Sequence, residues 1–152
     1  MNKTKTILMA AIIAGTLDAI AAILLYAKPP NLHNISRIFR YIASGLVGKQ
    51  AYLTGPFYPI AGLILHYLIA LVWSAVYVYV LFRVFKPGSV LVKMILFACL
   101  IWVIMNGFIL PLSGLVSRYD GWAVMRSFTV LLLCVSLPVS LLVEKRFGKM
   151  HI

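Results

Sequence analysis

The chain has 152 residues, of which 63% are hydrophobic and only 11% are charged. Soluble domains contain roughly 45 to 50% apolar residues, so this composition excludes an ordinary soluble protein and indicates an integral membrane protein. The 14 Lys and Arg against 3 acidic residues give a formal net charge of +11. In a membrane protein such cations are expected to face anionic lipid headgroups, and no RNA-binding or zinc-finger pattern suggests nucleic acid as a partner.

Four apolar segments are long enough to cross the ~30 Å hydrocarbon core of a bilayer. They cover residues 7–27, 59–82, 90–112 and 122–143. Charged residues, Pro and Gly separate them, as is typical of connections between spans. The sequence therefore predicts an all-α, polytopic membrane protein, with four transmembrane helices in a bundle and a single domain over residues 1–152.

A fifth helix is predicted at residues 35–47, in the connection between the first two spans. Its apolar side chains recur at three- and four-residue spacing, and Arg37 and Arg40 fall elsewhere on the helical wheel. The apolar positions are Ile35, Ile38, Phe39, Ile42 and Leu46. A basic amphipathic helix of this kind is expected to lie in the membrane interface, as a lid or an anchor.

The distribution of basic residues predicts the orientation of the bundle, because four spans place both termini on one side. That side carries eight Lys and Arg, which are Lys3, Lys5, Arg83, Lys86, Lys93, Lys145, Arg146 and Lys149. The other side carries six, which are Lys28, Arg37, Arg40, Lys49, Arg118 and Arg126. The positive-inside rule then favours cytoplasmic N- and C-termini.

Asp18 is a carboxylate near the middle of the first span, where a charge costs at least ~2.5 to 3.5 kcal/mol. At a rise of 1.5 Å per residue, Asp18 lies ~13 Å below the outer end of its helix, His66 ~10 Å and Asn106 ~9 Å below the same face. We therefore expect these three side chains to line one polar cavity. Asp18 and His66 are expected within hydrogen-bond reach, directly or through one water, where they can share or relay a proton.

Further candidate residues share helical faces with these three. The full set predicted for binding or proton relay is Asp18, His66, Asn106, Thr16, Trp73, Tyr77, Trp102 and Ser113. The alternative is that these polar groups only hold the helices together, a role worth about 0.6 kcal/mol per contact on average.

Three classes of function are compatible with this pattern. The first is transport or proton and ion handling, with a lid or an anion-attracting set formed by Arg37, Arg40, Arg118 and Arg126. The second is an accessory or scaffold protein that binds lipid or a membrane protein, and the third is a haem- or other cofactor-binding module. A four-helix transporter is expected to form a homo-oligomer. The sequence contains no nucleophile motif, metal-ligand cluster or phosphate-binding loop, so we expect neither an enzyme nor a metal or cofactor site.

Three sequence stretches carry a resemblance to a known group of proteins. They are Gly15-Thr16-x-Asp18, Leu65 to Ala70, and Met105-Asn106 followed by Leu110 to Ser113. In these stretches the chain resembles an uncharacterised family of small four-helix bacterial inner-membrane proteins, and more distantly inner-membrane proteins associated with acid resistance. The resemblance implies four helices in a bacterial inner membrane and no established activity.

Overall fold

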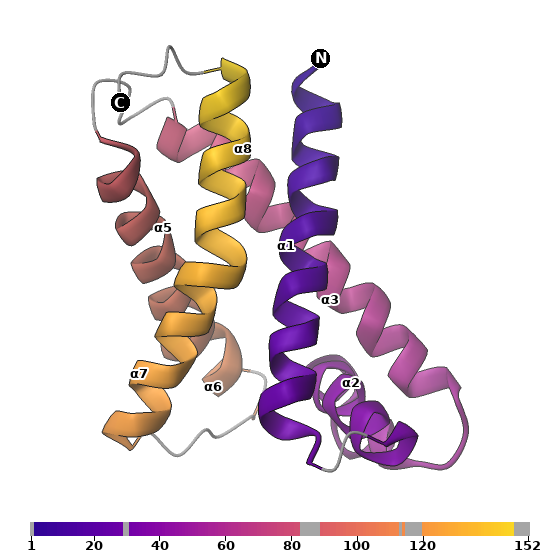
Figure 1. The fold of residues 1–152 in the computed structure, drawn as a ribbon. Helices are drawn as coiled ribbons and strands as arrows, with labels where there is room; N and C mark the ends of the chain where they lie inside the picture. The colour runs from indigo at the N-terminus through magenta and orange to yellow at the C-terminus, as the bar shows by residue number, and fades with distance from the viewer. Residues whose placement is uncertain (1, 29–30, 83–88, 113, 115–119, 148–152) are drawn as a thin grey trace.

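The computed structural model describes residues 2–28, 31–82, 89–112, 114 and 120–147. Two of the predicted site residues, Ser113 and Arg118, lie outside these ranges. The described residues form helices and contain no strand (Figure 1). The all-α architecture predicted from the sequence is confirmed.

Within the described ranges, four helical segments are long and apolar enough to cross a membrane. The first is α1 (Lys3–Tyr26), and the second is α3 (Phe57–Val76) continued by the π-helical η2 (Tyr77–Leu81). The third joins α5 (Val90–Ile104), the π-helical η3 (Met105–Ile109) and α6 (Leu110–Leu112). The fourth joins α7 (Gly121–Val130), the π-helical η4 (Leu131–Ser136) and α8 (Leu137–Phe147). The protein is a four-helix membrane bundle.

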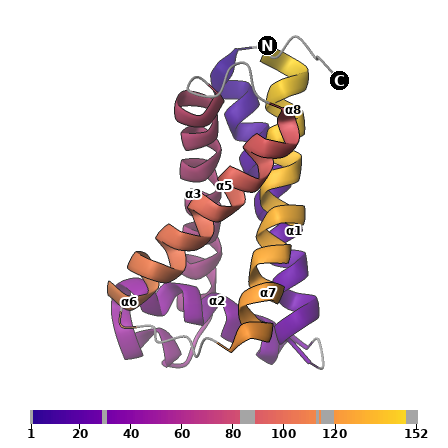
Figure 2. The same cartoon turned by 90° about the vertical axis from the view of Figure 1, so that its left-hand side faces the viewer.

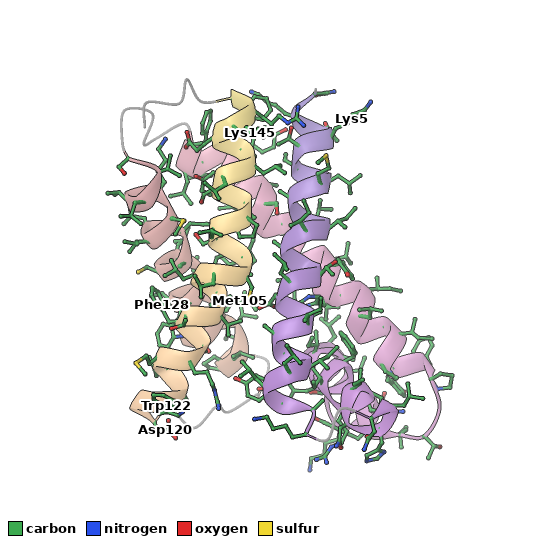
Figure 3. The ribbon with its side chains drawn as sticks, in the orientation of Figure 1. Lys5, Met105, Asp120, Trp122, Phe128 and Lys145 are labelled. Atoms are coloured by element: carbon green, nitrogen blue, oxygen red, sulfur yellow. The ribbon has the colours of Figure 1, made fainter. Side chains whose placement is uncertain are left out.

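The first and last helices extend about one turn beyond the predicted spans, to Lys3 and to Phe147. Hydropathy marks only the apolar part of a helix, whereas backbone hydrogen bonds continue through charged residues such as Lys5 and Lys145. Both labelled lysines lie at one end of the bundle, which we call the terminal end, and Asp120 lies at the opposite end, which we call the loop end (Figure 3).

The predicted helix between the first two spans is also present, as α2 (Leu32–Val47), and a short 3₁₀ helix, η1 (Gly48–Tyr52), follows it. The Asn31 side chain caps α2 by accepting a hydrogen bond from the Asn34 amide at 2.9 Å. Figures 1 and 2 show α2 lying across the loop end of the bundle, crosswise to α1. It therefore has the position expected of a lid.

The buried core lies toward the terminal end of the bundle. Tyr77 and Phe97 are fully buried and pack edge to face with ring centroids 4.9 Å apart, and Trp73 contacts Phe97 at 6.3 Å. Residues of α1 and α8, including Ala10 and Val139, complete this cluster. Many large apolar side chains elsewhere are exposed, which is the expected outer surface of a protein surrounded by lipid.

Two glycines allow helices to approach closely. A Cβ atom at Gly62 would lie 1.9 Å from the Phe39 carbonyl oxygen, so α2 can pack on α3 at this distance only with glycine there. A Cβ atom at Gly15 would lie 2.9 Å from Cδ1 of Tyr67, on the α1–α3 interface. These two contacts fix the positions of α1 and α2 relative to α3.

Candidate functional site

A cavity of about 410 Å³ lies inside the bundle, between α1, α2, α3 and the π-helical parts of the third and fourth spans. Its volume is in the range of sites that bind small organic molecules. The residues that line it are Gly15, Asp18, Tyr41, Ile42, Gly45, Leu46, Leu65, His66, Ile69, Ala70, Trp73, Ile101, Met105, Ile109, Leu110, Leu131 and Val135. Apart from Asp18 and His66, this lining is almost entirely apolar and aromatic.

Asp18 and His66 line the same cavity from α1 and α3, as the depth calculation predicts. They are close enough for their charges to interact. Among the described residues no hydrogen bond between the two side chains is found, and Nε2 of His66 lies 2.8 Å from the Gly15 carbonyl oxygen. The predicted contact through one water stays a prediction.

The hydrogen bond to Gly15 determines the tautomer of His66. A carbonyl oxygen only accepts hydrogen bonds, so Nε2 must donate and keeps its proton in both charge states of the ring. Nδ1 is therefore the ring nitrogen left for another contact, and the imidazole of α3 is held in one orientation against α1.

Thr16 belongs to the α1–α3 interface beside the cavity rather than to its wall. Its Oγ1 atom lies 2.9 Å from the hydroxyl oxygen of Tyr67, and this contact adjoins the close approach at Gly15. Tyr67 in turn packs edge to face on His66, with ring centroids 5.6 Å apart. Thr16 and Tyr67 thus position the histidine-bearing segment of α3 against α1.

The structure does not bring Asn106 to the cavity, in contrast to the expectation from its depth. Its Nδ2 atom donates to the Trp102 carbonyl oxygen at 3.0 Å, while Trp102 Nε1 donates to Ser127 Oγ at 3.0 Å. The wall of the cavity is formed instead by the neighbouring apolar stripe of Ile101 and Met105. The Trp102 side chain of the same predicted stripe is thus turned toward the fourth span.

Trp73 lines the cavity, whereas Tyr77 lies one turn further along the same helix and is not part of the lining. Tyr77 is fully buried in the core near the terminal end. The predicted stripe on this helix is therefore split, with His66 and Trp73 on the cavity and Tyr77 beyond it.

The arginines that were predicted to form a lid or to attract anions differ from one another in their contacts. Arg40 donates to the carbonyl oxygens of Ala51 at 2.8 Å, Gly55 at 2.5 Å and Leu53, so it holds the segment after α2 in place. Arg37 is exposed on α2. Arg37, Arg40 and Arg126 are not among the cavity-lining residues, and Arg118 lies outside the described ranges.

Arg126 lies with its guanidinium carbon 5.1 Å from the centre of the Tyr26 ring. This cation–π contact links α7 to the last turn of α1. Its position is consistent with a structural role at the loop end, and an attraction for anions by Arg37 or Arg126 stays a prediction.

The sequence reasoning missed a buried ion pair near the terminal end. Lys93 Nζ lies 2.7 Å from Glu144 Oε1, and the two side chains are only 3% and 9% exposed. Lys93 also lies 5.4 Å from the centre of the Phe82 ring. The sequence does contain an indication of this pair. Lys93 and Glu144 each lie at the end of an apolar segment, and the four-span topology places these two ends on the same side of the membrane.

Three of the four spans contain a π-helical segment, and η3 and η4 supply Met105, Ile109, Leu131 and Val135 to the cavity wall. Such segments leave a wider turn in the helix and are frequent at functional sites.

No family model, curated protein or solved structure matches this chain. The resemblance to small bacterial inner-membrane proteins stays a prediction.

Proposed function

We propose that this protein is a membrane transporter that binds a small hydrophobic cation in its cavity and exchanges it for a proton. The observation that carries the proposal is an apolar, ligand-sized cavity whose lining contains one carboxylate, Asp18, and one imidazole, His66. A carboxylate inside a membrane bundle is costly, so it is retained where it binds or moves a charge.

The lining favours a cation over an anion. Asp18 is the carboxylate of the cavity, and among the residues that the structure describes no Lys or Arg lines it. Aromatic side chains, Tyr41 and Trp73, add faces that attract cations. The apolar walls suit a hydrocarbon or aromatic body, so an amine or other cation with a large apolar part fits both features of the site.

Exchange with a proton follows from charge balance. Ionising Asp18 in apolar surroundings is unfavourable unless a cation lies beside it. Binding of the cation therefore releases the carboxyl proton, and Nδ1 of His66 is the neighbouring base that can accept it. Return of the proton neutralises Asp18 and lets the cation leave.

The position of α2 supports a gating role in this cycle. This helix contributes Tyr41, Ile42, Gly45 and Leu46 to the cavity wall, so displacement of α2 would widen the cavity. Its exposed Arg37 suits contact with anionic lipid headgroups. We propose accordingly that α2 lies in the interface of a bacterial inner membrane, and that both termini are cytoplasmic.

Direct binding of a hydrophobic cation tests the proposal. Radiolabelled tetraphenylphosphonium should bind the purified full-length protein in detergent with saturation, and Asp18→Asn should weaken this binding at least about tenfold. Asp120→Asn is the matched control, because Asp120 caps α7 at the loop end through the Ala123 amide and Asn caps a helix equally well. Absence of saturable binding, or equal weakening by both substitutions, would contradict the proposal.

A further inference from the structure

Three buried hydroxyl groups lie between the cavity and the terminal end of the bundle. They belong to Ser74, Tyr77 and Ser140, which are 1%, 0% and 0% exposed. None of the three oxygen atoms has a hydrogen-bond partner among the described residues. We call this set the hydroxyl cluster.

Tyr77 and Ser140 lie at the contact between the second and fourth spans. Ser74 and Tyr77 are three residues apart on one helix, and Ser140 and Glu144 are four residues apart on another, so each pair shares a helical face. The Tyr77 hydroxyl lies close to the Ser140 side chain and to Glu144. The cluster therefore adjoins the buried pair of Glu144 and Lys93.

The unmet hydrogen bonds of this cluster point to bound water. Buried polar groups are nearly always paired with protein atoms or ordered water, and a buried water typically makes about three hydrogen bonds. Ser136 shows that a buried serine in this bundle can be satisfied by protein alone, since its Oγ donates to the Met94 carbonyl oxygen at 2.6 Å. Ser74 and Ser140 have no such contact among the described residues.

The cluster is also well placed to connect the two polar regions of the bundle. Trp73 lines the cavity and directly precedes Ser74. Ser74 is eight residues from His66, which corresponds to ~12 Å along the helix. Beyond the cluster, Glu144 and Lys93 lie near the ends of their helices, at the terminal end.

We infer that Ser74, Tyr77 and Ser140 enclose a bound-water site, and that this water passes the proton of the Asp18 site to the terminal end of the bundle. The second half of this inference rests on the proposed function. Hydroxyl groups are suited to proton transfer because each one both donates and accepts hydrogen bonds. A proton can therefore move along a series of hydrogen bonds without leaving a net charge on the hydroxyls.

X-ray radiolytic footprinting of the purified protein tests the water site directly, because radicals formed from bound water modify the side chains beside it. Tyr77 should be modified in spite of its complete burial, and Ser140→Val, which fills the space and removes a hydroxyl, should reduce the modification severalfold. Ser136→Ala is the control and should leave it unchanged, since Ser136 is already satisfied by a backbone carbonyl. An unmodified Tyr77 in the wild-type protein, or equal effects of both substitutions, would overturn the water site.

Proton movement is tested separately in proteoliposomes. Tyr77→Phe should slow proton release driven by tetraphenylphosphonium severalfold without changing equilibrium binding of the cation, and the matched control Tyr79→Phe, at an exposed position on the same helix, should change neither. Unchanged release in Tyr77→Phe would overturn the proton path. If the cation does not bind at all, the proposed function fails, while footprinting still decides whether the cluster holds water.

Discussion

Nε2 of His66 donates a hydrogen bond to the carbonyl oxygen of Gly15, across the interface between α3 and α1. One contact thus ties the imidazole to the helix that carries Asp18 and leaves Nδ1 as the nitrogen to which we assign the proposed proton transfer. The hydrogen bond to Gly15 determines both the orientation of the imidazole and which of its nitrogens carries the proton. Substitutions of His66 can separate these two effects.

His66→Gln is expected to keep the binding of tetraphenylphosphonium and to slow proton exchange. The Gln side-chain amide can donate to the Gly15 carbonyl oxygen, but it cannot take up a proton. His66→Leu removes both properties and should also lower the thermal stability of the protein in detergent. Equal rates of proton release in wild type and His66→Gln, measured with a pH dye in liposomes, would rule out His66 as the proton acceptor.

Gly62→Ala is expected to displace α2 from α3. The new Cβ would lie 1.9 Å from a backbone oxygen of Phe39, which cannot move as a side-chain end can. Overpacking of this kind costs about 1–3 kcal/mol or more, so the thermal transition in detergent should fall by several degrees. Gly107→Ala is the control, because a Cβ there meets no atom within 4 Å. Equal stability of the two variants would contradict the close approach of these helices.

Removing one member of the Lys93–Glu144 pair should destabilise the bundle by about 3–5 kcal/mol, because the other charge is then buried alone. Lys93→Met and Glu144→Met are each expected to lower the free energy of unfolding by this amount. The double variant should lose less than the sum of the two single losses. Lys145→Met, at an exposed position on the same helix as Glu144, serves as the control. Additive losses in chemical denaturation would show that the pair is not coupled.

Arg40→Lys should loosen the segment that follows α2. The guanidinium group donates to three carbonyl oxygens between Ala51 and Gly55, and an ammonium group cannot reproduce this forked arrangement. Hydrogen–deuterium exchange should become faster from Gly48 to Gly55. The same substitution at the exposed Arg37 should leave exchange in this segment unchanged, and a similar increase in both variants would argue against the role of Arg40.

Much of the fold follows from hydropathy and helical geometry. The four spans and α2 were predicted because long apolar runs and amphipathic spacing are direct consequences of burial in lipid or at a surface. The common cavity of Asp18 and His66 was predicted from their depth, which depends only on the rise per residue.

The predictions from sequence were wrong or incomplete for the rotation of the third span about its axis and for the pairing of charged residues between helices. Asn106 is not on the cavity, and Trp102, on the same predicted stripe, contacts Ser127 of the fourth span. Residue spacing along one helix shows which side chains share a face, but it does not show toward which neighbouring helix that face is turned. The Lys93–Glu144 pair was missed because each residue, taken alone, resembles a charge at the end of a span. Only the packing of α5 against α8 shows that the two face each other.

Proton release on cation binding tests the role of Asp18 most directly. Tetraphenylphosphonium is added to the purified protein in weakly buffered solution, and the change in pH is recorded for wild type, Asp18→Asn and Asp120→Asn. Wild type and Asp120→Asn should release a proton for each cation bound, with affinity that rises with pH, whereas Asp18→Asn should release none. Cation binding without proton release in the wild-type protein, or release that persists in Asp18→Asn, would contradict proton exchange at Asp18.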